Sequence, residues 1–125
     1  TVNHNPIGPK ILLAEDSADN ATLIRLYLKK MKADVHWAQN GQEAVQLAQA
    51  QPYDLILMDI QMPVLDGFDA ALKIREAGVS TPIIALTAHA LGEHRTKALN
   101  GGFNDYLTKP IESRLLMEII DRYSP

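Results

Sequence analysis

From Lys10 onward, short apolar runs alternate with longer segments in which apolar residues recur at helical spacing. This alternation is typical of β-α-β units, in which helices join parallel strands. Five strand–helix pairs fit the length. The expected strands are Ile11 to Ala14, Asp34 to Ala38, Asp54 to Met58, Pro82 to Thr87 and Phe103 to Leu107. The third and fourth are nearly continuous apolar runs, which predicts central strands buried on both faces.

Capping residues mark where the intervening helices begin and end. We expect starts at Ser17, at Asn40 with Glu43, and at Asp66 with Asp69, and an end of the third helix at Gly78. The predicted buried stripes are Ile24, Tyr27, Leu28 and Met31 in the first helix and Ile111, Leu115, Ile119 and Tyr123 in the last. The segment from Gly92 to Asn100 has few apolar residues, so we expect it to be the least firmly packed helix.

Length and composition restrict what such a chain does. A chain of 125 residues fits one domain, here residues 10–125, preceded by a polar tail or linker over residues 1–9. The net charge of −3 gives no broad basic field for nucleic acid or an anionic membrane. No apolar run approaches the roughly 20 residues that span a bilayer. With no cysteine, any metal must bind oxygen or imidazole. We expect a cytoplasmic domain that contacts neither nucleic acid nor membrane.

Polar side chains follow the predicted strands at their carboxyl ends, where ligands bind in open parallel α/β sheets. These residues are Glu15 and Asp16 after the first strand, Asp59 after the third, Thr87 after the fourth, and Thr108 and Lys109 after the fifth. Taken singly, each has an ordinary explanation as a turn, cap, strand or solvated surface residue. Together they would place three carboxylates, a hydroxyl group and an amine at one edge of the sheet.

Three crowded carboxylates repel one another unless they keep protons or are neutralised by a cation and Lys109. Mg²⁺ is the economical neutralising ion, because it takes one or two carboxylates and keeps several waters. Glu15, Asp16 and Asp59 would supply such an incomplete shell. A carboxylate beside a cation and an ammonium group is able to attack phosphorus and form an acyl phosphate. Asp59 is the best candidate nucleophile, because it follows the rigid apolar run that ends at Met58.

These residues resemble the receiver domain of two-component response regulators, and the resemblance runs from Lys10 to Tyr123. It rests on the acidic pair Glu15-Asp16, the segment Met58-Asp59-Ile60-Gln61-Met62-Pro63 with Asp66-Gly67, Thr87-Ala88, and Lys109-Pro110. The resemblance implies a flavodoxin-like (βα)5 fold with a five-stranded parallel sheet in the order 2-1-3-4-5 and helices on both faces. Apart from the resemblance, capping chemistry explains Asp66 and Gly67 as structural residues.

The resemblance also implies roles for individual residues. Asp59 would accept phosphate from a histidine of a partner kinase or phosphotransfer protein. Glu15, Asp16, Asp59 and the backbone carbonyl of Gln61 would hold Mg²⁺ or Mn²⁺. Thr87 and Lys109 would bind the phosphoryl group, and Tyr106 would turn inward as Thr87 moves. The alternative for Tyr106 is an ordinary half-buried aromatic residue on an edge strand. Lys109-Pro110 is similar to the family's usual cis peptide.

The finer wording resembles receivers attached to hybrid sensor histidine kinases. It comprises Glu15-Asp16-Ser17 with Asn20, Asp59-Ile60-Gln61-Met62-Pro63, Ala85-Leu86-Thr87-Ala88-His89-Ala90 and Asn104-Asp105-Tyr106-Leu107. Such receivers exchange phosphate with a histidine phosphotransfer domain. The resemblance implies that the receiver catalyses its own phosphorylation and dephosphorylation, and that kinase activity resides elsewhere. Phosphorylation would shift the conformation of the region from Gly92 to Tyr106.

Three other functions compete with this interpretation. An aspartyl-phosphate phosphatase also uses an Asp nucleophile and Mg²⁺, but it usually needs a longer chain, and the sequence shows neither an Asp-x-Asp at Asp59 nor a substrate-covering cap. A flavin carrier of similar architecture would need a Ser/Thr-rich phosphate loop after the first strand, and the sequence has no such loop there. A degenerate receiver acting only in protein interactions would not need the complete acidic, hydroxyl and amine set.

The first helix carries more apolar residues than one buried stripe requires. Leu23 and Leu26 lie beyond the row that contains Ile24 and Met31. Such a surplus indicates an exposed recognition patch for the phosphohistidine partner. Wider burial of the helix under the tail explains the pattern equally well.

Overall fold

A computed structural model describes residues 8–88 and 100–123 of the chain. Strands and helices alternate through these residues, as the apolar pattern predicts. The elements are β1 (Lys10–Ala14), α1 (Ala18–Lys30), β2 (Asp34–Ala38), α2 (Gly41–Ala50), β3 (Leu55–Asp59), α3 (Gly67–Glu76), β4 (Ile83–Thr87), β5 (Asp105–Thr108) and α5 (Ser113–Tyr123).

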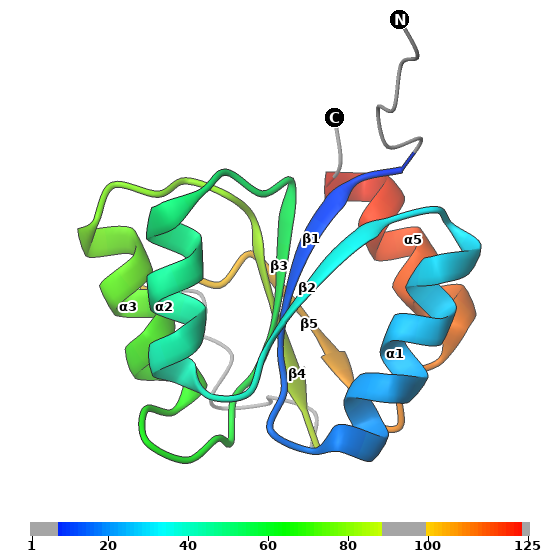
Figure 1. The fold of residues 1–125 in the computed structure, drawn as a ribbon, viewed down its shortest axis with the longest axis horizontal. Coiled ribbons are helices and arrows are strands. Elements are labelled where there is room, and N and C mark those ends of the chain that lie inside the picture. The colour runs from blue at the N-terminus through cyan, green and yellow to red at the C-terminus, as the bar shows by residue number, and fades with distance from the viewer. Residues whose placement is uncertain (1–7, 89–99, 124–125) are drawn as a thin grey trace, which may run out of the picture.

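The five strands form one parallel sheet in the order β2-β1-β3-β4-β5, which confirms the expected topology. Helices α1 and α5 cover one face, and α2 and α3 cover the other (Figure 1). After β1 the chain runs to β2 on one side and then returns to β3 on the other side. The strand order therefore reverses between β1 and β3, which places the expected ligand crevice at their carboxyl ends.

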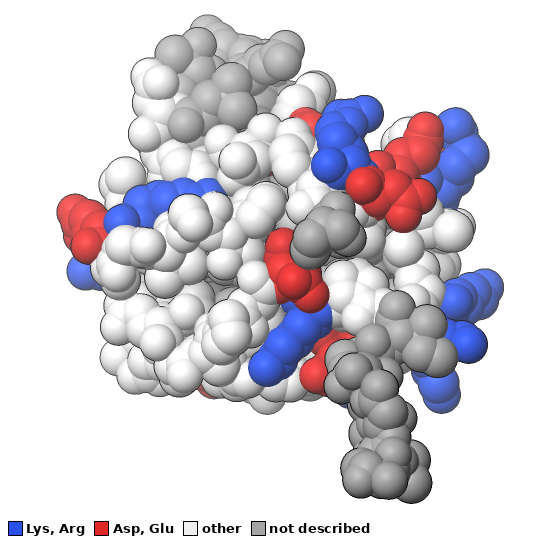
Figure 2. All heavy atoms as spheres, turned by 90° about the horizontal axis from the view of Figure 1, so that it is seen from above, with Lys and Arg blue, Asp and Glu red and all other residues white. Residues whose placement is uncertain are grey.

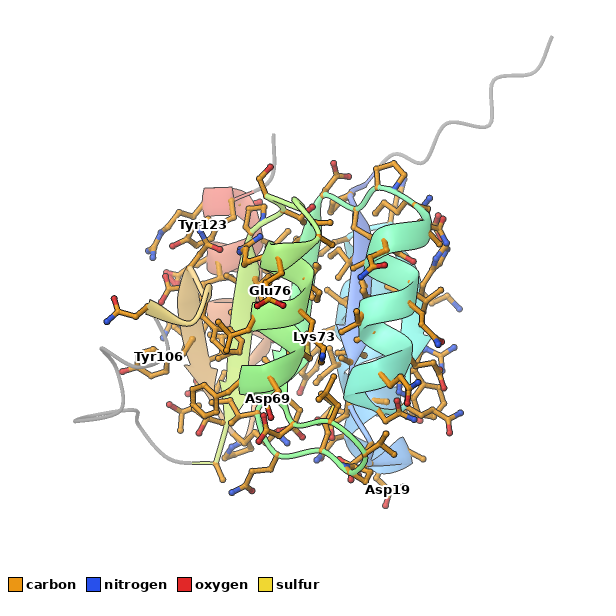
Figure 3. The ribbon with its side chains drawn as sticks, turned by 90° about the vertical axis from the view of Figure 1, so that its left-hand side faces the viewer. Asp19, Asp69, Lys73, Glu76, Tyr106 and Tyr123 are labelled. Carbon is orange, nitrogen blue, oxygen red and sulfur yellow. The ribbon has the colours of Figure 1, made fainter. Side chains whose placement is uncertain are left out.

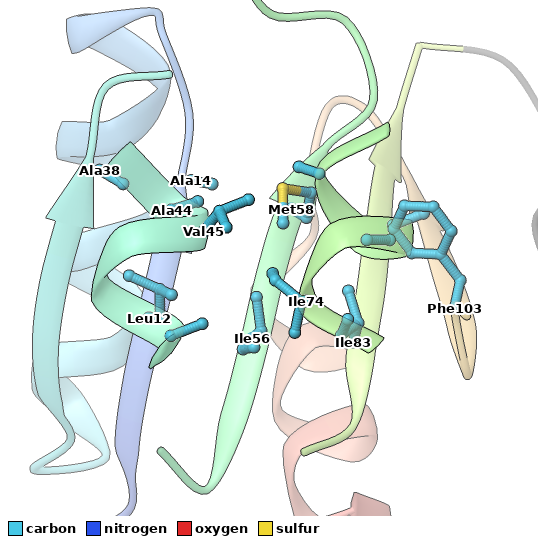
Figure 4. Packing of buried hydrophobic residues seen from close by; sticks show 14 of the residues in the cluster. Leu12, Ala14, Ala38, Ala44, Val45, Ile56, Met58, Ile74, Ile83 and Phe103 are labelled. Atoms are coloured by element: carbon cyan, nitrogen blue, oxygen red, sulfur yellow. The ribbon is translucent and has the colours of Figure 1, made fainter. Parts of the chain in front are cut away.

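Successive residues of the central strands point to opposite faces and build two separate cores. Leu12, Ile56, Met58 and Ile83 pack with α2 and α3, together with Ile74 and Phe103 (Figure 4). Their neighbours in sequence, among them Ile11, Leu13, Leu55, Leu57, Ile84 and Leu86, pack against α1 and α5. Every residue of β3 is buried, so the strand that carries Asp59 at its end is held from both sides.

The predicted caps are all present. Ser17, Asn40 and Asp66 accept hydrogen bonds from the backbone amides of Asn20, Glu43 and Asp69 at 3.3, 2.8 and 2.9 Å. Gly78 has a φ of +87° and follows the C-cap of α3. Its amide and that of Val79 donate to the carbonyls of Arg75 and Ile74, the pattern of a Schellman motif. Lys109-Pro110 is cis, as the resemblance implied.

The bounds of β1, β3, β4 and β5 differ from prediction by one or two residues, and side-chain contacts accompany the changes in β5 and β3. β5 begins at Asp105, not Phe103, which is buried in the core between the sheet and α3. The Asn104 side-chain oxygen accepts from the amide of Ile83 at 2.9 Å, which takes the place of a backbone partner. β3 runs from Leu55 to Asp59, one residue later than predicted. Just before it, the Asp54 amide donates to the Lys10 carbonyl at 2.8 Å, and the Asp54 carboxylate accepts from the Lys10 amide at 2.8 Å.

The predicted stripe of α5 was wrong at one position. Leu115 is 38% exposed, whereas Leu116, Ile119 and Ile120 are buried and Tyr123 packs against the same core. Positions 116, 119, 120 and 123 follow the i, i+3, i+4, i+7 spacing of a helical face. The predicted series placed one residue at every fourth position. Because a helix has about 3.6 residues per turn, such a series rotates gradually away from the buried face. In α1, by contrast, Ile24 and Leu28 are buried as expected, and Tyr27 and Met31 pack beside them.

Some predictions fall outside the described residues. They include the helix expected from residue 92 onward and most of the tail. Gly8 and Pro9 lie beside the start of β2, where the Gly8 amide donates to the Lys32 carbonyl at 3.2 Å.

Within the described part of the chain, no helix is both long and apolar enough to cross a membrane. On the face seen in Figure 2, basic and acidic side chains are interspersed.

Candidate functional site

Three carboxylates meet where β1 and β3 end. Glu15 and Asp16 follow β1, and Asp59 is the last residue of β3. Each offers one carboxylate oxygen, and these oxygens lie within 4.8 Å of one another. Glu15 is fully buried and Asp59 is 4% exposed, whereas Asp16 is exposed. The site therefore has a buried floor and an open side, at the edge that the reversal of strand order selects.

Lys109 reaches this group from the loop after β5. Its Nζ lies 2.7 Å from Asp59 Oδ2 and 3.2 Å from Glu15 Oε1. The Lys109 amide also donates to the Thr87 carbonyl at 2.7 Å, which ties the loop to the end of β4. Burial alone would lower the pKa of Lys109, but the two carboxylates outweigh it and raise the pKa above its ordinary value. Lys109 is therefore an ammonium ion directed at Asp59.

Glu15 stands in an unusual electrostatic position for a carboxylate. Burial, reinforced by the neighbouring Asp59, raises the pKa of Glu15 to about 7, although the Ser17 amide and Lys109 act in the opposite direction. Oε2 accepts from the Ser17 amide at 3.1 Å. Oε1 is buried without a hydrogen bond from the described residues, because Lys109 Nζ is close enough for an ion pair but not aligned to donate. The site has one ammonium group for two buried carboxylates.

The backbone around Asp59 is fixed by the turn that follows it. The Gln61 amide donates to Asp59 Oδ1 at 3.0 Å, so both carboxylate oxygens of Asp59 have a donor. The Gly67 amide donates to the Ile60 carbonyl at 2.7 Å. A Cβ atom at position 67 would clash with the Asp59 carbonyl. This confirms a structural role for Gly67, and Asp66 is the N-cap of α3 as expected.

The remaining predicted residues lie around this centre. Thr87 ends β4 one position beyond Leu86, the register partner of Asp59, and it is half-buried. Thr108 ends β5 and is exposed. Tyr106 is half-buried on the edge strand β5, where Figure 3 labels it. It packs against the rim of the core shared with α2 and α3. That placement is the alternative considered for Tyr106, and an inward turn of its ring stays a prediction.

The residues present fit a hard divalent cation. All the candidate ligands are oxygens, which suits Mg²⁺, and the buried Glu15 Oε1, which has an ion pair but no hydrogen bond from the described residues, has a lone pair to offer a cation. The open side toward Asp16 leaves room for water or phosphate oxygens. The Gln61 carbonyl as a further ligand stays a prediction, because the contact seen here is made by the Gln61 amide.

Two contacts at the site had not been predicted. The Trp37 indole Nε1 donates to the backbone carbonyl of Glu15 at 2.7 Å, and the Ser17 amide holds the Glu15 carboxylate. Ser17 was recognised only as a helix cap, although a capping turn directly after an acidic pair is a signal for such an amide contact. No sequence pattern connects Trp37 with Glu15, because strand pairing alone brings them together.

Comparison with known proteins identifies the family. A model of the response regulator receiver domain matches residues 11–121. The chain is 41% identical over 125 residues to the signal transduction histidine-protein kinase BarA of Escherichia coli, covering 98% of this chain and 14% of BarA. The chain belongs to the response regulator receiver domain family. It spans only a small part of the curated relatives that it matches.

Two solved structures are similar to the whole domain. One is the receiver domain of sensor histidine kinase PA1611 from Pseudomonas aeruginosa, with a magnesium ion coordinated in its active-site cleft. It is 45% identical, has a TM-score of 0.85, and the match covers 93% of this chain and 97% of that one. The other is the Saccharomyces cerevisiae Ssk1 receiver domain in complex with the histidine phosphotransfer protein Ypd1. It is 35% identical, has a TM-score of 0.87, and the match covers 94% of this chain and 89% of that one.

Proposed function

We propose that this domain takes part in a phosphorelay, in which Asp59 accepts a phosphoryl group from a phosphohistidine of a partner protein. The observation that carries the proposal is the position of Lys109 Nζ, 2.7 Å from the Asp59 carboxylate and beside two further acidic ligands. This combination of a buried carboxylate, an ammonium group and an acidic cation site is what phosphoryl transfer to a carboxylate needs.

In the proposed reaction, an Asp59 oxygen forms a bond to phosphorus as the P–N bond of the donor breaks. The electron pair of that bond goes to the donor imidazole nitrogen. Lys109 offsets negative charge near Asp59 throughout, and Thr87 donates to a phosphoryl oxygen after transfer. Glu15, Asp16, Asp59 and the Gln61 carbonyl would hold Mg²⁺, or Mn²⁺ in its place. When bound, the cation supplies positive charge beside the phosphoryl oxygens.

The phosphoryl group would act as a conformational switch. It adds negative charge and acceptor oxygens near Thr87 and Lys109, so it favours the conformer whose donors come closest. Tyr106 lies on β5, which pairs with β4 where Thr87 ends and leads to Lys109. Movement of residues 92–106 is the proposed output, with Thr87 and Tyr106 as its switch residues.

We further propose that the domain is the cytoplasmic receiver of a hybrid sensor histidine kinase. The kinase activity would then reside in another domain or protein, and residues 1–9 would form a linker ahead of the receiver. Similarity to part of BarA supports this assignment. The expected partner is a histidine kinase or a histidine phosphotransfer domain, and the similarity to Ssk1 in its complex with Ypd1 supports the latter.

Helix α1 is the proposed docking surface for this partner. Leu23 is 40% exposed and Leu26 is 53% exposed, so both project from the helix that begins directly after the acidic pair. Exposed apolar side chains beside an acceptor site suit the contact that a phosphohistidine protein must make to bring its phosphorus to Asp59.

Phosphotransfer from a purified phosphotransfer domain that carries phosphohistidine tests the proposal. The label should move to the wild-type protein in the presence of Mg²⁺ and not to Asp59→Asn. The matched control is Asp66→Asn, because asparagine still caps α3 and the charge change occurs outside the proposed ligands. Transfer to Asp59→Asn at the wild-type rate would refute Asp59 as the acceptor.

A further inference from the structure

The strongest unassigned contact near the site is made by Trp37, the single tryptophan of the chain. Trp37 lies on the edge strand β2, and its side chain is half-buried against the core formed with α1 and α5. Its indole Nε1 donates to the Glu15 carbonyl at 2.7 Å. The next residue of β2, Ala38, accepts from the Glu15 amide at 3.0 Å. Two neighbouring residues of β2 therefore hold both backbone polar groups of Glu15.

This attachment sets where the acidic loop begins. Glu15 is the first residue after β1, and its side chain is already held by the Ser17 amide. With the backbone held by Trp37 and Ala38, Glu15 has contacts that fix its carboxylate relative to Asp59. Such outer contacts orient metal ligands and tune their affinity for the ion. Of the two hydrogen bonds that hold the Glu15 backbone here, the one from the indole is made by a side chain.

The ring of Trp37 is in turn held by Arg25, an exposed residue of α1. The guanidinium carbon of Arg25, on α1, lies 5.5 Å from the centre of the Trp37 ring. This geometry is a cation–π contact, which restrains the ring while leaving its N–H free to face Glu15. The contacts thus run from exposed Arg25 through Trp37 to buried Glu15, a proposed ligand of the cation.

We infer that Trp37 is a positioning residue for the Mg²⁺ site, acting through the backbone carbonyl of Glu15. The inference rests on the proposed function, in which Glu15, Asp16 and Asp59 bind the cation. Loss of the indole N–H should weaken Mg²⁺ binding by roughly tenfold, the effect typical of removing an outer contact of a metal ligand. Occupation of the site should in turn change the environment of the indole.

Trp37→Phe is the direct test, because phenylalanine keeps an aromatic ring under Arg25 and removes the N–H. Mg²⁺ is titrated into ¹⁵N-labelled protein, and its Kd is taken from the amide shifts of Asp16 and Ser17. The matched control is Tyr53→Phe, which removes an aromatic hydroxyl group that lies 2.8 Å from Nδ1 of His36, the residue before Trp37 on β2. We expect a Kd about tenfold higher for Trp37→Phe and unchanged for Tyr53→Phe.

A Kd for Trp37→Phe within twofold of wild type would overturn the inference and leave the proposed function intact. Failure of the wild-type protein to bind Mg²⁺ would overturn both. If Trp37→Phe does not fold, the indole ¹H–¹⁵N signal of the wild-type protein decides the question. It should shift during the titration with the same Kd as the Asp16 amide, and an indole signal unmoved at saturation would refute the role of Trp37.

Discussion

Replacing Glu15 with glutamine should stabilise the protein when no divalent cation is present. Glu15 is buried beside Asp59, and the pKa of Glu15 is about 7 against an ordinary value of 4.5. The folded state therefore holds the Glu15 proton more tightly than the unfolded state does. The contribution of Glu15 to stability is therefore greatest below pH 4.5 and is lost as the pH rises toward 7, because folding then has to accommodate a buried carboxylate.

The size of the effect follows from that difference in pKa. At about 1.4 kcal/mol for each pH unit, an ionised Glu15 costs on the order of 3 kcal/mol at pH 8. At pH 5 most folded molecules keep the proton, and the cost is about 1 kcal/mol or less. Glutamine has the same shape, carries no charge and still accepts from the Ser17 amide. The gain from Glu15→Gln at pH 8 should thus exceed the gain at pH 5 by about 2 kcal/mol.

Urea unfolding at the two pH values, with a chelator present, measures this difference. Adding Mg²⁺ should reverse the order at pH 8, because a cation that binds the folded state stabilises the wild-type protein more than a variant that lacks one ligand charge. Equal stability of the two proteins at pH 8 without metal, or a gain that is the same at both pH values, would refute the electrostatic account of Glu15.

Three further predictions concern other parts of the domain. Arg75→Met should lower the free energy of unfolding by roughly 2 to 3 kcal/mol, because Arg75 donates to the carbonyls of Gly102 and Val79 at 2.8 Å; a loss below about 0.5 kcal/mol in urea unfolding would contradict this. Gly67→Ala should lower the free energy of unfolding by about 2 kcal/mol and slow phosphorylation, because the added Cβ atom displaces the Asp59 backbone. A variant with wild-type stability and phosphorylation rate would show that the turn relaxes without consequence. Leu26→Asp should slow transfer from a phosphotransfer domain several-fold but leave phosphorylation by a small phosphodonor unchanged, and equal slowing of both reactions would count against docking on α1.

The main features of the fold and site follow from short-range patterns in the sequence. Continuous apolar runs identify β3 and β4 as central strands, since only a strand covered on both faces buries successive residues. Once the strands are parallel, their carboxyl ends must share an edge. Glu15, Asp59 and Lys109 were therefore predicted to meet although 44 and 50 positions separate them along the chain, and the structure confirms that they do.

Other features depend on contacts that no local pattern records. The start of β5 was misplaced because the Asn104 side chain binds the Ile83 amide, a choice set by how the loop meets β4. The buried face of α5 was misjudged at Leu115 because adjacent leucines at 115 and 116 leave two helical phases open until the sheet selects one. The Trp37 contact with Glu15 arises from the pairing of β2 with β1.

Phosphorylation of Asp59 is the central claim, and intact-mass analysis tests it most directly. The protein and Asp59→Asn are incubated with acetyl phosphate, with and without Mg²⁺, and any acyl phosphate is located by borohydride reduction and fragmentation. The proposed function predicts one added phosphoryl group on Asp59, dependent on Mg²⁺ and absent from the variant. No added mass on the wild-type protein with Mg²⁺ bound, or modification at another residue, would contradict it.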